Sequence, residues 1–128
     1  MSTKYIGVTT EQFQTFSQLP VEGPFQMLNL LKFKDKVEET GTTGAEAYAQ
    51  YMKAVIPFFQ ASKAKVVYQG KPQFTLIGPE DEKEWDKILI IEYASKEDFI
   101  KMITAEGYPA KMRSQALEDS RLILSIAQ

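Results

Sequence analysis

The sequence predicts a single α+β domain in which four antiparallel strands and two main helical regions follow the order β-α-β-β-α(α)-β. Three observations lead to this fold class. The chain has 128 residues, which is typical of one domain. Short apolar runs bounded by turn residues predict strands, and stretches with apolar residues at helical spacing lie between these runs. In such a split βαβ arrangement, helices cover one face of a single sheet.

The first 22 residues are expected to form a helical lead-in to the domain, which spans residues 23–128. Thr9 begins the helix, and Gln12 three residues later predicts a capping box. Two phenylalanines follow at helical spacing, and Pro20 ends the helix. We expect this element to pack on the outside of the domain.

The first half of the domain contains one strand and the longest helix. Residues 25–34 predict the strand, and a polar loop over residues 35–44 follows it. Alternation places Met27, Asn29, Leu31 and Phe33 on one strand face and Gln26, Leu28, Leu30 and Lys32 on the other. The helix runs from Ala45 to about Ser62, with Pro57 expected to kink it. Its apolar stripe consists of Tyr48, Tyr51, Met52, Val55 and Phe59.

The second half of the domain predicts the remaining strands. Residues 65–69 and 73–77 indicate one long strand bent at Gly70-Lys71-Pro72, with a tight hairpin as the alternative. Residues 87–93 are nearly all apolar, as in a central strand covered on both faces. Ser95 begins a helix, and Pro109 stands at the first position of another that continues through residue 119. Residues 121–127 predict the last strand.

Two absences from the composition limit the chemistry of this chain. It contains no His and no Cys, which excludes Ser-His-Asp and Cys-His catalysis, disulfides, thiolate metal sites and haem held by either residue. We therefore expect no cofactor. A metal would need oxygen ligands alone, and the acidic run over residues 80–86 lacks the spacing of a calcium loop. That run predicts a solvated loop, so no metal site is expected.

Charge and hydropathy exclude several partners. The net charge is −2 and the pI is near 5.2, so no basic surface for nucleic acid or anionic membrane is expected. No apolar run approaches the roughly 20 residues that span a bilayer. The first five residues do not resemble a secretory signal. We expect a cytoplasmic protein.

A sheet covered by helices on one side leaves its other face bare. We expect that face to be buried in a homodimer, because Leu31, Phe33 and Ile123 are assigned to it.

Asn29 and Glu92 are the candidate catalytic residues. Glu92 follows four aliphatic residues on a central strand, where burial raises the pKa of a carboxyl group and suits it to act as a base. The alternative is an ion pair with Arg113 or Arg121. Asn29 lies among apolar neighbours, so its amide requires a hydrogen-bond partner. That partner is a ligand, the neighbouring backbone, or water at a dimer interface.

Five further residues are candidate ligand contacts. Arg113 and Arg121 suit bidentate binding of a carboxylate or phosphate, although an arginine at such a position more often braces a turn and pairs internally. Tyr68, Tyr93 and Tyr108 offer phenols within an aromatic lining suited to a planar ligand, with plain core packing as the alternative.

Several short motifs occur in an order that resembles a known family. They are Ile91-Glu92-Tyr93-Ala94-Ser95, Phe99, Ala105-Glu106-Gly107-Tyr108, Arg113 and Asp119-Ser120-Arg121, preceded by Tyr48-x-x-Tyr51, Pro57, Gly70 and Ile77-Gly78. The chain from about Gly23 to Ala127 is similar in these motifs to the domain-of-unknown-function family thirteen-thirty. The resemblance implies a ferredoxin-like fold of the dimeric α/β-barrel superfamily, whose members include cofactor-independent monooxygenases, isomerases, haem-handling enzymes and stress-responsive barrels. It implies no particular reaction.

The leading hypothesis is a protein that binds a small apolar or aromatic molecule in a pocket on the sheet. Asn29, Glu92, Arg113 and Tyr108 would supply its polar contacts. One alternative is a cofactor-independent monooxygenase or isomerase with Glu92 as base and with Asn29 or an arginine stabilising an enolate. Another is a non-catalytic structural or interaction module. The sequence leaves open whether the protein is an enzyme.

Overall fold

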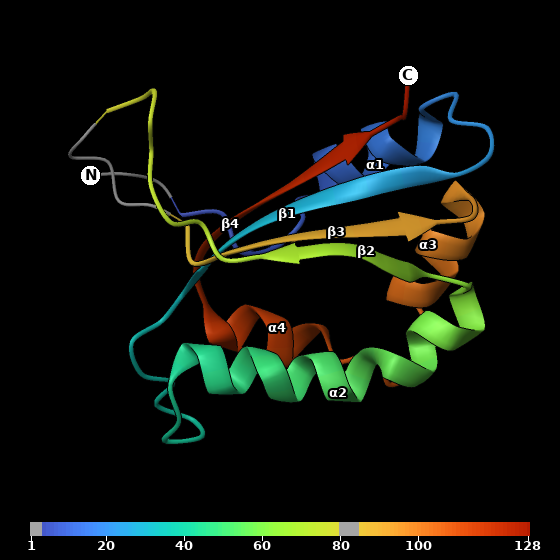
Figure 1. Ribbon diagram of the computed structural model, residues 1–128. Helices are drawn as coiled ribbons and strands as arrows, with labels where there is room; N and C mark the ends of the chain where they lie inside the picture. Colours follow the sequence, from blue (N-terminus) through green and yellow to red (C-terminus); the bar gives the residue numbers. More distant parts are fainter. Residues whose placement is uncertain (1–3, 80–84) are drawn as a thin grey trace.

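One antiparallel sheet organises the fold (Figure 1). The computed structural model describes residues 4–79 and 85–128. Its elements, in chain order, are α1 (Thr10–Gln18), β1 (Phe25–Phe33), α2 (Gly44–Ser62), β2 (Lys65–Gly70), β3 (Lys87–Tyr93), α3 (Lys96–Ile103), α4 (Ala110–Ala116) and β4 (Leu117–Ser125). The strands lie in the order β2-β3-β1-β4, all neighbours antiparallel. The predicted ferredoxin-like α+β fold is confirmed.

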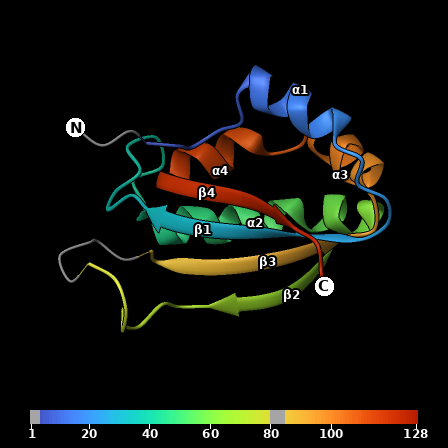
Figure 2. The same cartoon turned by 90° about the horizontal axis from the view of Figure 1, so that it is seen from above.

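The helices leave one face of the sheet open. Helices α2 and α4 run beneath the sheet in Figure 1. The view from above in Figure 2 shows the strands in front of α2, with α4 toward the β4 edge and α1 beyond it. Alternate residues of β1 are buried from Phe25 to Leu31, whereas the residues between them are partly exposed. The core therefore lies between the inner face of the sheet and the helices, as expected for a strand with period 2.

The assignment of Leu31 and Phe33 to the bare face is wrong. Leu31 is fully buried in the core, and the centroid of the Phe33 ring lies 5.4 Å from that of Tyr48 on α2. Both faces of β1 are apolar, so alternation alone does not tell which face the helices cover. We call the uncovered side the open face; it carries Leu28, Leu30, Ile88, Ile90 and Ile123, which stand opposite one another in the strand register.

The capping residues in the sequence correctly predict where α1 and α3 begin. The Thr9 hydroxyl accepts a hydrogen bond from the Gln12 backbone N–H at 3.1 Å, as predicted for the start of α1. The Gln12 side chain departs from a full capping box, because its amide oxygen accepts from the Thr9 hydroxyl. Ser95 caps α3 in the same way. The last turns of α2, which contains Pro57, bend away from the axis of its first turns (Figure 1).

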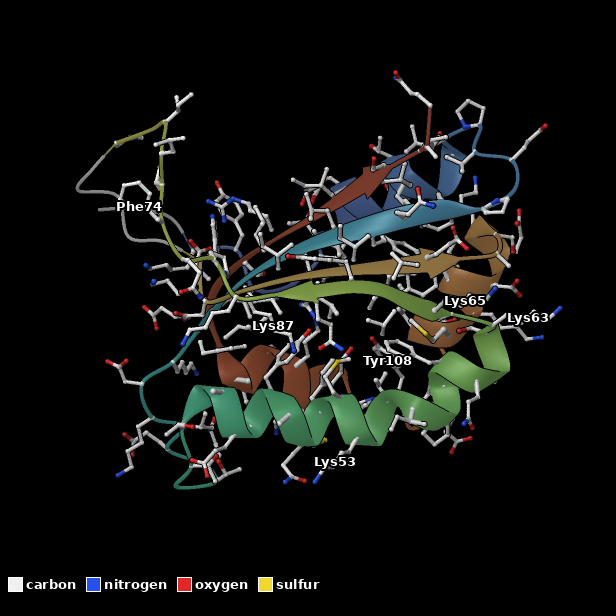
Figure 3. The ribbon with its side chains drawn as sticks, in the orientation of Figure 1. Lys53, Lys63, Lys65, Phe74, Lys87 and Tyr108 are labelled. Carbon is white, nitrogen blue, oxygen red and sulfur yellow. The ribbon has the colours of Figure 1, made fainter. Side chains whose placement is uncertain are left out.

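The prediction of a strand over residues 73–77 is wrong. Strand β2 ends at Gly70, and the segment after it, residues 71–78, which we call the arm, is not in the sheet. Pro72 has no backbone N–H to continue the ladder. Three apolar side chains on the arm are almost fully exposed, at 78% for Phe74, 85% for Leu76 and 93% for Ile77. The arm rises on the open-face side, where Figure 3 labels Phe74.

The last strand begins four residues earlier than predicted. Helix α4 ends at Ala116, with Pro109 as its N-cap, and β4 starts at Leu117 opposite Phe33. The register shifts between Lys32 and Phe33, a local irregularity that the sequence pattern does not reveal. Most of the acidic run predicted as a loop, residues 80–84, lies outside the described residues. Within the described part of the chain, no helix is long and apolar enough to cross a membrane.

Candidate functional site

A cavity of about 590 Å³ lies between the inner face of the sheet and the helices. Every helix and the three strands β1, β3 and β4 contribute to its wall, which is mostly apolar. The apolar lining includes Phe13, Phe16, Met27, Met52, Phe59, Ile91, Phe99, Ile103, Leu122 and Leu124. Its volume falls within the roughly 300–1,000 Å³ of typical small-molecule sites.

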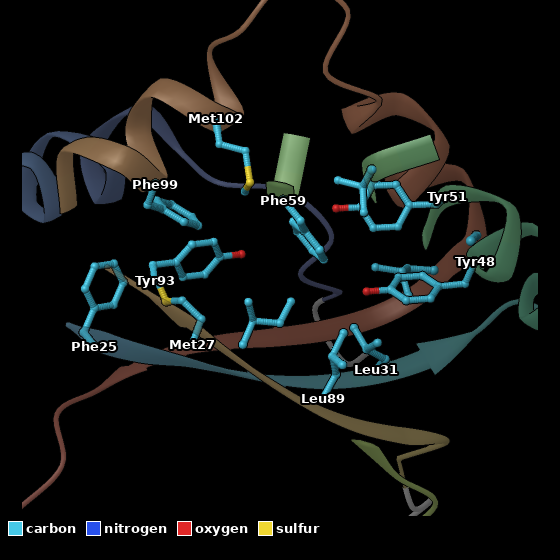
Figure 4. Close-up of a cluster of buried hydrophobic side chains, with 14 residues drawn as sticks. Phe25, Met27, Leu31, Tyr48, Tyr51, Phe59, Leu89, Tyr93, Phe99 and Met102 are labelled. Carbon is cyan, nitrogen blue, oxygen red and sulfur yellow. The ribbon is translucent and has the colours of Figure 1, made fainter. Parts of the chain in front are cut away.

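Three phenol hydroxyls point into the space between helices and sheet. Figure 4 shows the side chains of Tyr48 and Tyr51, from α2, and of Tyr93, from β3, with their oxygens directed toward that space. Tyr48 and Tyr51 belong to the α2 stripe that faces the sheet, which explains their burial. The hydroxyl of Tyr51 shares a hydrogen bond of 2.9 Å with that of Tyr108. The phenols therefore provide hydrogen-bonding groups within a mostly apolar cavity.

Burial keeps these phenols protonated. Loss of solvent raises the pKa of Tyr48, and it raises those of Tyr51 and Tyr93 far above the ordinary value. The neighbouring phenol of Tyr108 raises the pKa of all three further, while the positive charge of Arg113 opposes the rise in all three. At neutral pH the three hydroxyls are therefore neutral and retain the proton that a donor needs.

Arg113 and Asn29 form the charged end of the cavity wall. Nη2 of Arg113 donates to Oδ1 of Asn29 at 3.2 Å. The Asn29 amide nitrogen donates in turn to the carbonyl oxygens of Leu89 at 3.2 Å and of Met27 at 3.4 Å. Asn29 is 4% exposed, so these bonds fix its orientation. The central strand thereby positions an arginine that projects from α4.

The N-terminal segment closes the cavity at the β4 edge. Residues 5–8 belong to the cavity wall. The backbone N–H of Tyr5 donates to Oδ1 of Asp119 at 2.9 Å, and the Ser120 hydroxyl donates to the Tyr5 carbonyl at 2.5 Å. Nη1 of Arg113 makes a longer contact of 3.5 Å with the carbonyl oxygen of Ile6. The lead-in expected on the outside of the domain thus also forms part of the candidate site.

Helix α1 is held against α3. The rings of Phe16 and Phe99 meet edge to face with centroids 5.4 Å apart. The Lys96 ammonium donates to the carbonyl oxygens of Ser17 and Leu19, both at 2.7 Å. These two carbonyls lie at the C-terminal end of α1, where a cation interacts favourably with the helix dipole.

The structure brings together five of the seven predicted site residues. Asn29, Tyr93, Tyr108, Arg113 and Arg121 all line the cavity. Nη1 of Arg121 donates to Asp119 at 2.9 Å, and its guanidinium lies 4.7 Å from the centroid of the Tyr5 ring. This internal pair is one of the two roles that the sequence predicted for Arg121.

The other two predicted residues do not reach the cavity. Glu92 and Tyr68 lie on the open face, because they share strand register with Gln26 and Ile90 respectively. The Glu92 carboxylate accepts a hydrogen bond of 2.8 Å from the Gln26 amide, and among the described residues it forms no ion pair with Arg113 or Arg121. Tyr68 is 52% exposed. The assumption that Glu92 and Arg113 share one pocket is therefore not met.

Two site residues were missed at the sequence level. Tyr48 and Tyr51 were assigned to core packing because they lie on the apolar stripe of α2. A usable signal was their residue type, since a buried tyrosine needs a partner for its hydroxyl that phenylalanine does not. Two tyrosines three positions apart on a buried stripe thus indicate a polar spot within the core.

The described lining of the cavity offers hydrogen-bond donors and two arginines, of which Arg121 is paired with Asp119, but no carboxylate. Among the described residues that line it, the titratable side chains are tyrosines and arginines. Within the same part of the chain, no group of three or more acidic residues is placed to hold a metal ion. Such a lining suits binding of a molecule that carries acceptor groups on an apolar body.

Comparison with solved structures relates the chain to a protein from Rhodopseudomonas palustris. The crystal structure of RPA0582, a protein of unknown function from that organism, has 42% sequence identity and a TM-score of 0.88, with 98% of this chain and 99% of that chain covered. The chain belongs to the same family as RPA0582. A structure of the methylated RPA0582 protein gives 40% identity and a TM-score of 0.88, covering 99% of this chain and 98% of the other.

A more distant structure supports the fold alone. A DABB family protein with a ferredoxin-like fold from Mesorhizobium loti has 12% identity and a TM-score of 0.53, with 84% of this chain and 99% of that chain covered. No protein-family model matches the chain, so the resemblance to family thirteen-thirty stays a prediction. Among curated proteins there is no significant match.

Proposed function

We propose that the protein binds a small molecule with an aromatic or otherwise apolar body in the cavity between the sheet and the helices. The observation that carries this proposal is the cavity of about 590 Å³ with a mostly apolar wall and several inward-facing phenols. A packed core fills such space with side chains. Apolar space with a few convergent polar groups is the common form of a ligand site.

The proposal is tested with N-phenyl-1-naphthylamine, an uncharged aromatic probe whose fluorescence rises in apolar surroundings. We expect saturable binding by the native protein. Leu122→Trp adds bulk to the cavity wall and should weaken binding at least tenfold. The matched control is Val67→Trp. Val67 is 51% exposed and Leu122 is 49% exposed, and each lies on an edge strand of the sheet. Unlike Leu122, Val67 does not line the cavity.

A second control separates this cavity from the open face. Glu92→Gln should leave probe affinity within twofold, since Glu92 lies on the opposite side of the sheet from the cavity. Equal loss of binding in Leu122→Trp and Val67→Trp would place the probe elsewhere and refute the proposal. So would the absence of saturable binding by the native protein.

We also propose that two copies of the chain pair through their open faces, with the arm as part of the interface. At about 4.8 Å between strands and 3.3 Å per residue, a face of four strands and the seven residues of β3 covers roughly 450 Å². A standard interface buries about 800 Å² per partner. The exposed apolar side chains of the arm rise on the same side of the sheet and extend this area. A second copy is the favoured occupant because an apolar face pairs with itself across a two-fold axis.

Native mass spectrometry tests this pairing. The native chain should appear at twice 14.5 kDa. Leu76→Asp, on the arm, should shift the population toward monomer, whereas Ile56→Asp, at a 48% exposed position on α2, should not. Leu76 is 85% exposed, so its loss does not disturb the core. A native monomer at micromolar concentration would contradict the proposal.

A further inference from the structure

We propose that the molecule bound in the cavity is an organic anion whose carboxylate or sulfonate group is held by Arg113. This inference rests on the proposed function and names the class of ligand. It begins from the contrast between two arginines that both line the cavity. Arg121 has an acidic partner, Asp119, at 2.9 Å. Among the described residues, no carboxylate lies within ion-pair distance of Arg113.

The known contacts of Arg113 are to neutral oxygens. They are the Asn29 side-chain oxygen at 3.2 Å, the Ile6 carbonyl at 3.5 Å and the hydroxyl of Tyr48, whose pKa this hydrogen bond lowers. A guanidinium has five N–H donors in a planar fork, so these three contacts leave donors for a further partner. The Asn29 contact fixes the plane of the fork, since Asn29 is itself held by two backbone carbonyls. Arg113 is therefore positioned in advance for a planar anionic group.

The surroundings of Arg113 favour an anion. The wall near it carries phenols that burial keeps protonated, so their hydrogens are available for donation. The cation influences the ionisation of Tyr48, Tyr51 and Tyr93, which places all three within electrostatic reach of it. A partly buried cation without a counter-charge is costly unless a ligand supplies one. An anion bound here would find both a charge partner and neutral donors.

The remainder of the ligand should be apolar. Beyond the arginine and the phenols, the wall is built mainly from aromatic and aliphatic side chains. Inorganic anions would gain the charge contact but would leave this apolar surface unfilled. The chemistry that fits both parts is an aromatic or aliphatic acid with one anionic group at its end.

The test compares two probes that share an aromatic body and differ in charge. They are 8-anilinonaphthalene-1-sulfonate, which is anionic, and N-phenyl-1-naphthylamine, which is neutral. We expect the native protein to bind both, with the neutral probe displacing the anionic one. Arg113→Gln should weaken binding of the anionic probe at least tenfold and leave that of the neutral probe within twofold. Retained binding of the neutral probe also shows that the variant is folded.

The matched control is Lys111→Gln, which removes one positive charge from an exposed position on the same helix. It should change neither affinity by more than twofold. The native protein could bind both probes in the cavity while Arg113→Gln weakens the binding of both equally, or of neither. In that case the assignment of an anion to Arg113 is wrong and the proposed function stands. If the native protein binds neither probe, the proposed function itself fails.

Discussion

Raising the pH should destabilise the protein through its buried tyrosines. Tyr51 and Tyr93 are each 4% exposed, and burial lifts their pKa values far above those of the unfolded chain, near 10. The folded state then holds protons that the unfolded state releases, so this stability is complete below about pH 9 and is lost as the pH rises further. Each such tyrosine costs about 1.4 kcal/mol between about pH 9 and 11, or roughly 3 kcal/mol for the pair.

The assay is urea unfolding followed by circular dichroism across this pH range, with tyrosinate absorbance recorded in parallel. Tyr48 should add to the loss, while Lys87, whose pKa burial lowers, acts in the opposite sense. Tyr51→Phe isolates one contribution, because it should remove about 1.4 kcal/mol of the pH dependence. Tyr68→Phe, at an exposed position, is the matched control. The reasoning is refuted if all six tyrosines ionise together near pH 10 while the protein stays folded.

Two further predictions concern a close backbone contact and the anchor of the N-terminal segment. Gly44→Ala should cost at least about 2 kcal/mol in the free energy of unfolding, because its Cβ would lie 2.5 Å from the Lys34 backbone nitrogen and 2.7 Å from the Ala116 carbonyl. The control is Gly7→Ala, where no atom lies within 4 Å of the added Cβ, so the free energy of unfolding should change by less than about 0.5 kcal/mol. Equal losses for the two variants in denaturant titrations would contradict the close contact at Gly44. Asp119→Ala removes the acceptor oxygen and should release the N-terminal segment, which speeds hydrogen exchange at the Tyr5 amide. Burial raises the pKa of Asp119, but hydrogen bonds from Tyr5, Arg121 and Ser120 together lower it below its usual value. The native protein should therefore lose the protection of the Tyr5 amide only as the pH falls below about 4. Slow exchange of this amide in the variant would disprove the anchoring role of Asp119.

Local patterns predicted most of the fold. Strand β3 was predicted with the bounds that the structure shows, because a run of apolar residues between charged turns is a strong strand signal. The helix caps at Thr9 and Ser95 were also predicted, because a capping side chain lies close in sequence to the backbone N–H group that it accepts from. Errors arose where non-local pairing decided the outcome. The residues after Gly70 have strand-like composition, but in the structure they lie outside the sheet.

The candidate site was predictable only in part. Asn29 was identified because an amide among apolar residues demands a partner, and that partner proved to be Arg113 together with backbone carbonyls. Glu92 was misplaced relative to the cavity because it lies on a strand with apolar residues on both faces, and only the helices define which face is inside. The covering role of residues 5–8 depends on contacts with Asp119 and Ser120, more than 100 positions away, for which no local pattern exists.

The hydrogen bond between Tyr51 and Tyr108 has a consequence for the range of molecules that the cavity can accept. Two phenols carry two hydrogens, and their mutual bond of 2.9 Å uses one of them in either direction. If Tyr51 donates to Tyr108, the second hydrogen lies on Tyr108, and reversal of the bond moves it to Tyr51. A rotation of two O–H groups, with no movement of the backbone, therefore transfers the free hydrogen from a residue of α2 to one beside α4. The pair acts as an adjustable donor that can meet acceptor atoms at two different positions.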